Sequence, residues 1–201
     1  MKVLGLTGGI GMGKSTADQL LRERGVAVVD TDVLARRLVE PGQPALVEIQ
    51  NTFGKEIVDA NGGLRREELA RRVFADPASR QRLEDILHPR IRALWLAQVE
   101  VWRAEGRPVA VVVIPLLFET NAHFDATICV ACSAATQRQR LQSRGWNAGQ
   151  IDQRINAQWP VEKKMALSDF VVWTEAGLDV HAAQLERILT TSGSAPAQAG
   201  C

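Results

Sequence analysis

The sequence predicts an α/β fold in which a parallel β-sheet carries helices on both faces. Short apolar runs alternate with stretches of helical periodicity along the 201 residues of the chain, an order typical of parallel sheets. The apolar runs are rich in Val and Ile and lack polar alternation, as expected of strands buried on both faces. A glycine-rich segment also joins the first apolar run to the first helical stretch.

The first strand is expected over residues 2–7, and a phosphate-binding loop follows it. Residues Gly8–Thr16 (GGIGMGKST) fit the pattern G-x-x-x-x-G-K-[ST] between a strand and a helix. Backbone N–H groups of such a loop curl around phosphate oxygens, and the helix N-terminus adds a partial positive charge. Lys14 is expected to reach the β- and γ-phosphates, and the Ser15 hydroxyl to ligate Mg²⁺. The chain is therefore expected to bind a nucleoside triphosphate on the three-layer fold of P-loop nucleoside-triphosphate hydrolases.

Two carboxylates follow the second strand, which is expected over Val26–Val29 after a first helix at about residues 14–24. The segment Asp30-Thr31-Asp32 lies at the strand edge where ligands of parallel sheets bind. Phosphoryl transfer needs one carboxylate for Mg²⁺ and another to accept the proton of the attacking hydroxyl. Beside a phosphate loop we favour these roles, although Thr31 or Asp32 would also serve as a helix N-cap.

About eighty residues separate the second and third strands, which is too many for a simple crossover. We expect this block to be a helical insertion that carries a second substrate. Pro89 should kink or break its last helix, because proline removes a helical hydrogen bond. His88 is a candidate ligand contact or a helix-end residue, and Arg65, Arg66, Arg71 and Arg72 alternate with Glu67 and Glu68 as on a mixed exposed face. The expected helices are Asp32–Val39, Ala45–Phe53, Arg66–Phe74 and Ala78–Ala104.

The third and fourth strands are expected over Val109–Ile114 and Thr127–Ala131. Pro115–Glu119 (PLLFE) follows the third strand, either as an apolar substrate wall, with Glu119 near a metal or a ribose hydroxyl, or as a tight turn. Spacing alone leaves that choice open. Cys129 and Cys132 form a C-x-x-C pair, but no second ligand pair accompanies them, so we interpret them as small core residues.

Residues 134–160 form a second insertion before the last expected strand, Phe170–Trp173. In a mobile lid its arginines would neutralise the transferring phosphoryl group, whereas on a static surface they would be a solvated face. The polar residues concerned are Gln137, Arg138, Arg140, Arg144 and Arg154.

These segments predict a single domain over residues 1–190. Its core comprises about 1–32, 108–133 and 161–190, the helical substrate insertion about 33–107 and the lid about 134–160. The tail 191–201 is composed of Thr, Ser, Gly, Ala, Pro, Gln and Cys without periodicity, and we expect it to be disordered.

Composition excludes several classes of function. The net charge of +1 provides no general attraction for nucleic acid or an anionic membrane. No apolar run approaches the roughly 18 residues that a membrane span needs. Three cysteines cannot form a disulfide framework. We therefore expect a cytoplasmic protein without nucleic-acid or membrane partners. The sequence does not determine the oligomeric state, for which we favour a monomer.

Several motifs resemble the dephospho-CoA kinase family, in order, from residue 2 to about 180. Leu6–Thr16 resembles its phosphate loop, and Val29–Asp32 its Asp-Ala-Asp motif. Leu87-His88-Pro89 is similar to its His-Pro motif, and Pro115–Glu119 to its Pro-Leu-Leu-Phe-Glu signature. Gln137–Arg144 and Arg154–Gln158 resemble the lid.

The resemblance implies ATP-dependent phosphorylation of the ribose 3′-hydroxyl of dephospho-CoA, with Mg²⁺ as cofactor. It implies that Asp32 is the general base, that Lys14 and Arg140 act on the phosphates, and that Ser15 and Asp30 hold the metal. ATP would be bound by Gly9, Gly11, Met12, Gly13, Lys14, Ser15, Thr16 and Arg140. Dephospho-CoA would be bound by Thr7, Asp32, His88, Leu116, Leu117, Phe118 and Glu119.

The chain departs from the family pattern at five positions, one of which is Ser168, where Ala before Asp169 is usual. Met12 replaces a small residue, Thr31 replaces Ala, and Gly145 follows Arg144 where Asp is usual. Glu175 stands where the family's Asn offers an amide to the adenine, which leaves the nucleotide selectivity open.

Two other functions share parts of this pattern. Another P-loop kinase of a small metabolite or nucleotide would have the same loop, carboxylates and arginines. A GTPase-like switch would be expected to carry Asn-Lys-x-Asp for guanine, and the sequence has no such motif.

Overall fold

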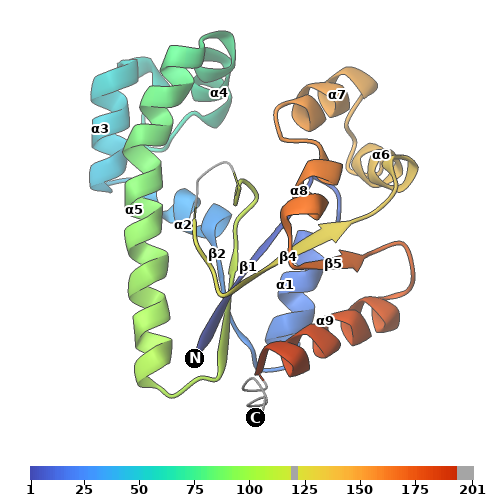
Figure 1. The fold of residues 1–201 in the computed structure, drawn as a ribbon. Helices are drawn as coiled ribbons and strands as arrows, with labels where there is room; N and C mark the ends of the chain where they lie inside the picture. Colours follow the sequence, from blue (N-terminus) through green and yellow to red (C-terminus); the bar gives the residue numbers. More distant parts are fainter. Residues whose placement is uncertain (119–121, 194–201) are drawn as a thin grey trace, which may run out of the picture. The chain divides into compact units, whose positions relative to one another are not determined.

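The computed structural model describes residues 1–118 and 122–193 of the chain (Figure 1). Glu119, predicted as a substrate contact, lies outside the described residues. The chain divides into two compact units, of which unit 1 comprises Met1–Asp30 with Val99–Cys201 and unit 2 comprises Thr31–Gln98.

Unit 1 is built on a five-stranded parallel sheet in the order β2-β3-β1-β4-β5. The predicted α/β fold class is therefore confirmed, and each strand lies within two residues of its predicted limits. The strands are β1 (Lys2–Gly8), β2 (Ala27–Asp30), β3 (Val109–Val113), β4 (Ala126–Ala131) and β5 (Phe170–Trp173).

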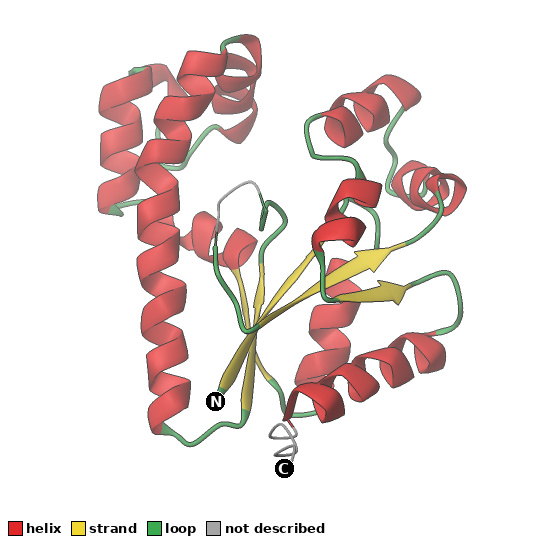
Figure 2. Ribbon diagram, in the orientation of Figure 1, coloured by secondary structure: helices red, strands yellow, loops and turns green. Residues whose placement is uncertain are grey.

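Helices α1 (Lys14–Glu23) and α9 (Leu178–Gly193) cover one face of this sheet (Figures 1 and 2). Leu4 and Leu6 of β1 point to that face and pack with Leu21 of α1 and Leu185 of α9. All four residues are fully buried. Because side chains alternate along a strand, Gly5 and Thr7 point to the opposite face. A β-carbon on Gly5 would lie 2.4 Å from Leu117, so this glycine allows the Pro115–Phe118 segment to pack against β1.

Three further helices of unit 1 occupy the segment between β4 and β5. They are α6 (Ala134–Gln142), α7 (Ala148–Asn156) and α8 (Val161–Leu167). Ser133 caps α6 by accepting from the Thr136 N–H. Asn147 and Gln150 form a reciprocal capping box that begins α7.

Unit 2 is helical. Its core joins Val39, which follows α2, to residues of α3, η1, α4 and α5, namely Ile49, Phe53, Ile57, Leu69 and Ile86. These elements are α2 (Thr31–Leu38), α3 (Pro44–Phe53), the 3-10 turn η1 (Lys55–Ile57), α4 (Arg66–Ala75) and the larger part of α5 (Pro77–Ala104), which continues into unit 1.

Pro89 was expected to kink or break the last helix of the insertion; a break is wrong, because α5 is continuous from Pro77 to Ala104. Proline leaves the Asp85 carbonyl without its helical donor, but both residues are exposed, so water can take that place. The Arg90 guanidinium adds a hydrogen bond of 2.6 Å to the Ile86 carbonyl one turn earlier.

At the other end of the chain, the tail begins later than predicted. Helix α9 extends to Gly193, with Ser192 buried, because its last turn still packs on unit 1. The remaining tail, 194–201, lies outside the described residues. Among the helices that the structure describes, none is long and apolar enough to cross a membrane.

Candidate active site

Three residues of the glycine loop between β1 and α1 have positive φ, namely Gly8, Gly11 and Gly13, and the first and last of them also lie close to neighbouring strands or loops. Gly8 has φ +148°, and a β-carbon there would lie 2.4 Å from the Val130 carbonyl oxygen of β4. Gly13, the N-cap of α1, has φ +100° and lies against Thr174. Larger residues would clash or be strained at both positions. Gly9, Gly11 and Met12 are buried between them, so the sequence G-x-x-x-x-G is needed here for the shape of the loop.

The N-terminus of α1 is arranged to receive an anion. Among the described residues, no side chain caps it, and its first turn carries no acidic residue. Ser15 is exposed in that turn, and Thr16 follows it half-buried. Lys14 donates from Nζ to the carbonyls of Gly8 at 2.7 Å and Gly9 at 3.0 Å, which folds its ammonium over the loop. Unpaired N–H groups and an adjacent cation are what a phosphate chain requires.

Two glutamines from the 134–160 segment hold the peptide groups of Ile10 in the loop. Gln137 of α6 donates to the Ile10 carbonyl at 2.7 Å, and Gln158 accepts from the Ile10 N–H at 3.0 Å. Gln137 is buried. The segment predicted as a lid is therefore in direct contact with the loop.

Thr174, which the sequence did not single out, connects the loop to Arg140. Its hydroxyl donates to the Met12 carbonyl at 3.0 Å and accepts from the Arg140 guanidinium at 2.9 Å. Arg140 also donates to the Thr174 carbonyl. A single threonine after a strand carries no signal that could have identified it. Its role depends on the contact between residues far apart in the chain.

We expect Thr174→Val to lower the stability of the protein by about 1–3 kcal/mol, because it leaves the buried Met12 carbonyl and an Arg140 N–H without a partner. It should also raise the KM for ATP. Thermal unfolding and initial rates measure both. Thr191→Val, which removes an exposed hydroxyl bonded to the Arg187 carbonyl, is the matched control. Equal effects of the two substitutions would contradict the role of Thr174.

Asp30 lies at the edge of the sheet from which the glycine loop emerges. Asp30 is paired with Val113 of β3, and Val113 is paired with Leu6 of β1. Asp30 therefore lies at the same position along the strand direction as Leu6, two residues before β1 ends. Asp30 is partly exposed there. Among the described residues, no group of three or more acidic, His or Cys side chains could hold a metal ion. Ser15 and Asp30 could therefore supply only part of a coordination shell.

Thr7 and a buried lysine hold the segment after β3. The Thr7 hydroxyl donates to the Pro115 carbonyl at 3.1 Å, and Lys164 of α8 donates to the same oxygen at 2.7 Å. Lys164 is fully buried, whereas Lys163 beside it is exposed, and nothing in the sequence distinguishes the two. Leu117 packs inward, while Leu116 and Phe118 remain partly exposed.

Other residues of the 134–160 segment are engaged away from the loop. Arg138 forms an ion pair of 2.5 Å with Asp152, and the Arg154 guanidinium lies 4.3 Å from the centre of the Trp146 ring. Arg144 is exposed. The contacts of these three arginines are those of a solvent-exposed helix face. Arg140 differs from them because it forms hydrogen bonds with Thr174.

Cys129 and Cys132 are buried, and burial raises the pKa of the Cys129 thiol to about 11. The interpretation of this pair as core residues is confirmed.

Unit 2 contains Asp32 in the first turn of α2, where it is exposed and lines a cavity of about 370 Å³. Thr31 before it is buried. His88 is exposed on α5 and is not among the residues that line this cavity, whereas its neighbour Leu87 is.

Comparison with known proteins decides the family. The model of the family "Dephospho-CoA kinase" matches residues 2–179. The dephospho-CoA kinase of Anaeromyxobacter dehalogenans is 46% identical over 192 residues, which are 94% of this chain and 91% of that protein. The chain belongs to the dephospho-CoA kinase family.

Further relatives agree with this assignment. The dephospho-CoA kinase of Bdellovibrio bacteriovorus is 38% identical, covering 94% of this chain and 95% of that protein. The crystal structure of TT1252 from Thermus thermophilus is 33% identical with a TM-score of 0.83, over 94% of this chain and 97% of that one. The dephospho-CoA kinase from Campylobacter jejuni, 23% identical over 94% and 96% of the two chains, shares the fold with a TM-score of 0.69.

The structure shows which groups Glu175, noted above as a departure from the family pattern, contacts. Its carboxylate accepts from the Ser133 N–H at 2.9 Å, the Thr136 hydroxyl at 2.8 Å and the Trp173 indole at 3.1 Å. These hydrogen bonds lower its pKa to about 2. Glu175 therefore stabilises the N-terminus of α6, where a negative charge is favourable.

His181 of α9 is a further residue that the sequence analysis missed. It is buried, and among the described residues its Nε2 has no hydrogen-bond partner. Burial, and after it the charge of Arg140, lowers the pKa of His181 below its ordinary 6.5. The imidazole is thus neutral at pH 7.

This pKa makes stability depend on pH. The unfolded chain protonates His181 first as the pH falls below 6.5, so the folded state should lose stability from there down to the lowered pKa. We expect the Tm of the wild type to fall more than that of His181→Leu between pH 7.5 and 5.5. Parallel decreases in both proteins would show that other groups cause the loss.

Proposed function

We propose that this chain transfers the γ-phosphoryl group of ATP to the ribose 3′-hydroxyl of dephospho-CoA, which produces CoA and ADP. The observation that carries the proposal is the family match over residues 2–179, because it includes both the glycine loop of unit 1 and the whole of unit 2.

The residues of the glycine loop bind the phosphates of ATP. Backbone N–H groups of Gly9, Gly11, Met12 and Gly13 and the first turn of α1 surround them, with Ser15 and Thr16 at that turn. The Lys14 ammonium leaves the Gly8 and Gly9 carbonyls for the β- and γ-phosphates. Because the transition state is loose, positioning and charge neutralisation supply most of the rate. Arg140, fixed on Thr174, adds positive charge beside the loop.

The Ser15 hydroxyl and the Asp30 carboxylate would hold Mg²⁺ together with the phosphates. Both are hard oxygen ligands, and this ion usually binds through one or two protein ligands plus substrate phosphates. When bound, it neutralises charge on the phosphoryl oxygens.

Asp32 accepts the proton of the 3′-hydroxyl as that oxygen attacks. Its place on the cavity of unit 2 supports the acceptor role of this unit. We further propose that Leu116 and Phe118 offer apolar contact to the acceptor. Thr7 and Leu117 act on that segment indirectly, since the Thr7 hydroxyl is bonded to Pro115 and Leu117 packs inward. His88 stays a candidate contact on the exposed side of α5, and Glu119 a candidate beyond the described residues.

We also propose that residues 134–160 close over bound ATP as a lid, and that the protein acts as a monomer. Gln137 and Gln158 already bond to Ile10, so closure needs only small movements about these contacts. If the lid closes, hydrogen exchange of residues 134–160 should slow when both substrates are bound. If the protein is a monomer, light scattering should give the mass of one chain in solution.

The deciding experiment measures ADP formation from MgATP with and without dephospho-CoA, and follows CoA by mass. Acceptor-dependent ADP with an equal amount of CoA supports the proposal. Binding of ATP without acceptor-dependent turnover would reject it and leave another small-metabolite kinase of the same fold.

A further inference from the structure

Helix α6 carries Arg140, and its place beside the glycine loop depends mainly on polar contacts. Of its nine residues, only Gln137 and Leu141 are buried. The Gln137 amide donates to the Ile10 carbonyl at 2.7 Å, and Arg140 is bonded to Thr174. A helix of this length is only marginally stable in water by itself. The position of Arg140 therefore depends on the groups that hold α6.

Glu175 holds the beginning of this helix. Its Oε1 accepts from the Ser133 N–H at 2.9 Å and from the Thr136 hydroxyl at 2.8 Å. Ser133 is the N-cap of α6, and Thr136 lies in its first turn. The Oε2 of Glu175 accepts from the Trp173 indole of β5 at 3.1 Å. One carboxylate thus connects α6 to a strand that is far from it in the sequence.

Thr174 and Glu175 are consecutive, and both contact α6. Thr174 bonds to Arg140 near the end of the helix and to the Met12 carbonyl of the glycine loop, while Glu175 bonds to the beginning of the helix. Thr136 and Arg140 are four residues apart, so they are neighbours on one helix face. The segment after β5 therefore holds this face of α6 at two points.

The charges of Arg140 and Glu175 act on the same buried group, the Cys132 thiol. Burial raises the pKa of this thiol, the charge of Arg140 lowers it, and the charge of Glu175 raises it. Among the ion pairs of the described residues, none joins Arg140 to Glu175. Glu175 therefore holds the helix while the Arg140 charge stays available for a phosphate.

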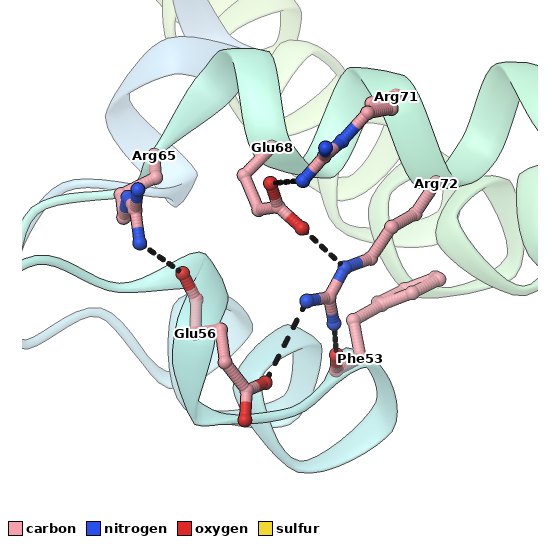
Figure 3. A network of polar contacts seen from close by, with 6 residues as sticks. All are labelled: Phe53, Glu56, Arg65, Glu68, Arg71 and Arg72. Atoms are coloured by element: carbon pink, nitrogen blue, oxygen red, sulfur yellow. Dashed lines mark hydrogen bonds and ion pairs between the residues drawn. The ribbon is translucent and has the colours of Figure 1, made fainter.

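Glu68 in unit 2 is a different kind of carboxylate. Figure 3 shows it bonded to Arg71 and Arg72, with Arg72 also paired with Glu56. The mixed face predicted from the alternation of Arg and Glu is therefore present. Among the described residues the donors to Glu175 are uncharged, so removing its carboxylate leaves no cation without its partner.

We propose that Glu175 is a positioning residue, which fixes α6 so that the Arg140 guanidinium is held where it contacts the phosphates of ATP. This inference rests on the proposed binding of ATP at the glycine loop. Glu175 acts through the helix and needs no contact with ATP. Its removal should therefore affect ATP and not the acceptor, and it should do so only while Arg140 is present.

The test is a double-mutant cycle of Glu175→Ala and Arg140→Met, measured as the KM for ATP and as the Kd for MgATP from calorimetry. Glu175→Ala should raise both values about tenfold in the wild type, because hydrogen bonds to an ionised group contribute on that scale. In the Arg140→Met background the same substitution should change them less than about twofold. The KM for dephospho-CoA should not change in Glu175→Ala, since α6 and β5 hold none of the proposed acceptor contacts.

Two further variants are controls. Glu162→Ala removes an exposed carboxylate from the first turn of α8 and should leave ATP binding unchanged. Glu175→Gln removes the negative charge but keeps an oxygen that can accept from Ser133 and Thr136. Its values should lie between those of the wild type and of Glu175→Ala. Thermal unfolding of each variant shows that it is folded.

The outcomes separate this inference from the proposed function. If the effect of Glu175→Ala is the same with and without Arg140, Glu175 does not act through that residue, and the inference is overturned. If Glu175→Ala and Glu175→Gln both tighten MgATP binding, the carboxylate acts by repelling ATP, which also overturns it. If MgATP binding shows the expected coupling but the wild type forms no CoA, only the proposed function fails.

Discussion

Replacing Lys14 by alanine is expected to lower kcat by about 10³-fold or more, since a charge that neutralises the transferring phosphoryl group contributes on this scale. The ammonium already lies on the Gly8 and Gly9 carbonyls, so the loop positions it before ATP binds. Coupled measurement of ADP formation at saturating MgATP and dephospho-CoA gives the rate.

Lys55→Ala is the control for this prediction, because Lys55 is exposed in unit 2. The control should retain the activity of the wild type. A Lys14→Ala protein with full kcat would refute the assignment of residues 8–16 as the phosphate loop.

Replacing Asp32 by asparagine is expected to lower kcat by about 10²–10⁴-fold while ATP binding stays nearly intact. The amide has the shape of the carboxylate but cannot accept the proton of the 3′-hydroxyl. Rates under saturation and the Kd for ATP from calorimetry separate the two effects. The pH dependence of kcat should also lose its acidic limb.

Asp85→Asn, on the exposed side of α5, controls for the loss of a carboxylate in unit 2. Equal losses of kcat and MgATP affinity in Asp32→Asn would make Asp32 mainly a metal ligand. In that case Asp30, at the sheet edge of unit 1, would be the alternative base to test.

Local patterns predicted most of the fold. Runs such as Val109–Val113 have five buried side chains in succession, which only a strand covered on both faces tolerates, and their limits followed from the sequence. The glycine loop was equally readable, because Gly8 and Gly13 are required by backbone conformation. Pro89 was misjudged, since a proline whose freed carbonyl faces water does not have to end a helix.

Residues that act through distant contacts could not be predicted in this way. Thr174 lies 162 positions from Met12, whose carbonyl it holds, and Lys164 lies 49 positions from Pro115. Glu175 drew notice in the sequence only because it lacks an amide for the adenine, whereas in the structure it accepts hydrogen bonds from Ser133 and Thr136 at the start of α6 and from Trp173 of β5. Such roles depend on which distant segments of the chain contact each other in the fold. A single sequence does not show these contacts.

The sequence pattern was thus enough to predict the phosphate loop, the parallel sheet and the family resemblance. These features could be predicted because backbone conformation and burial depend on a few neighbouring residues. Folding in three dimensions decided how its charged side chains are used. Arg65, Arg66, Arg71 and Arg72 look alike in the sequence, yet only Arg66 among them has no partner in the described part of the chain. That difference arises because a guanidinium is neutralised only where folding brings an acceptor within hydrogen-bond distance.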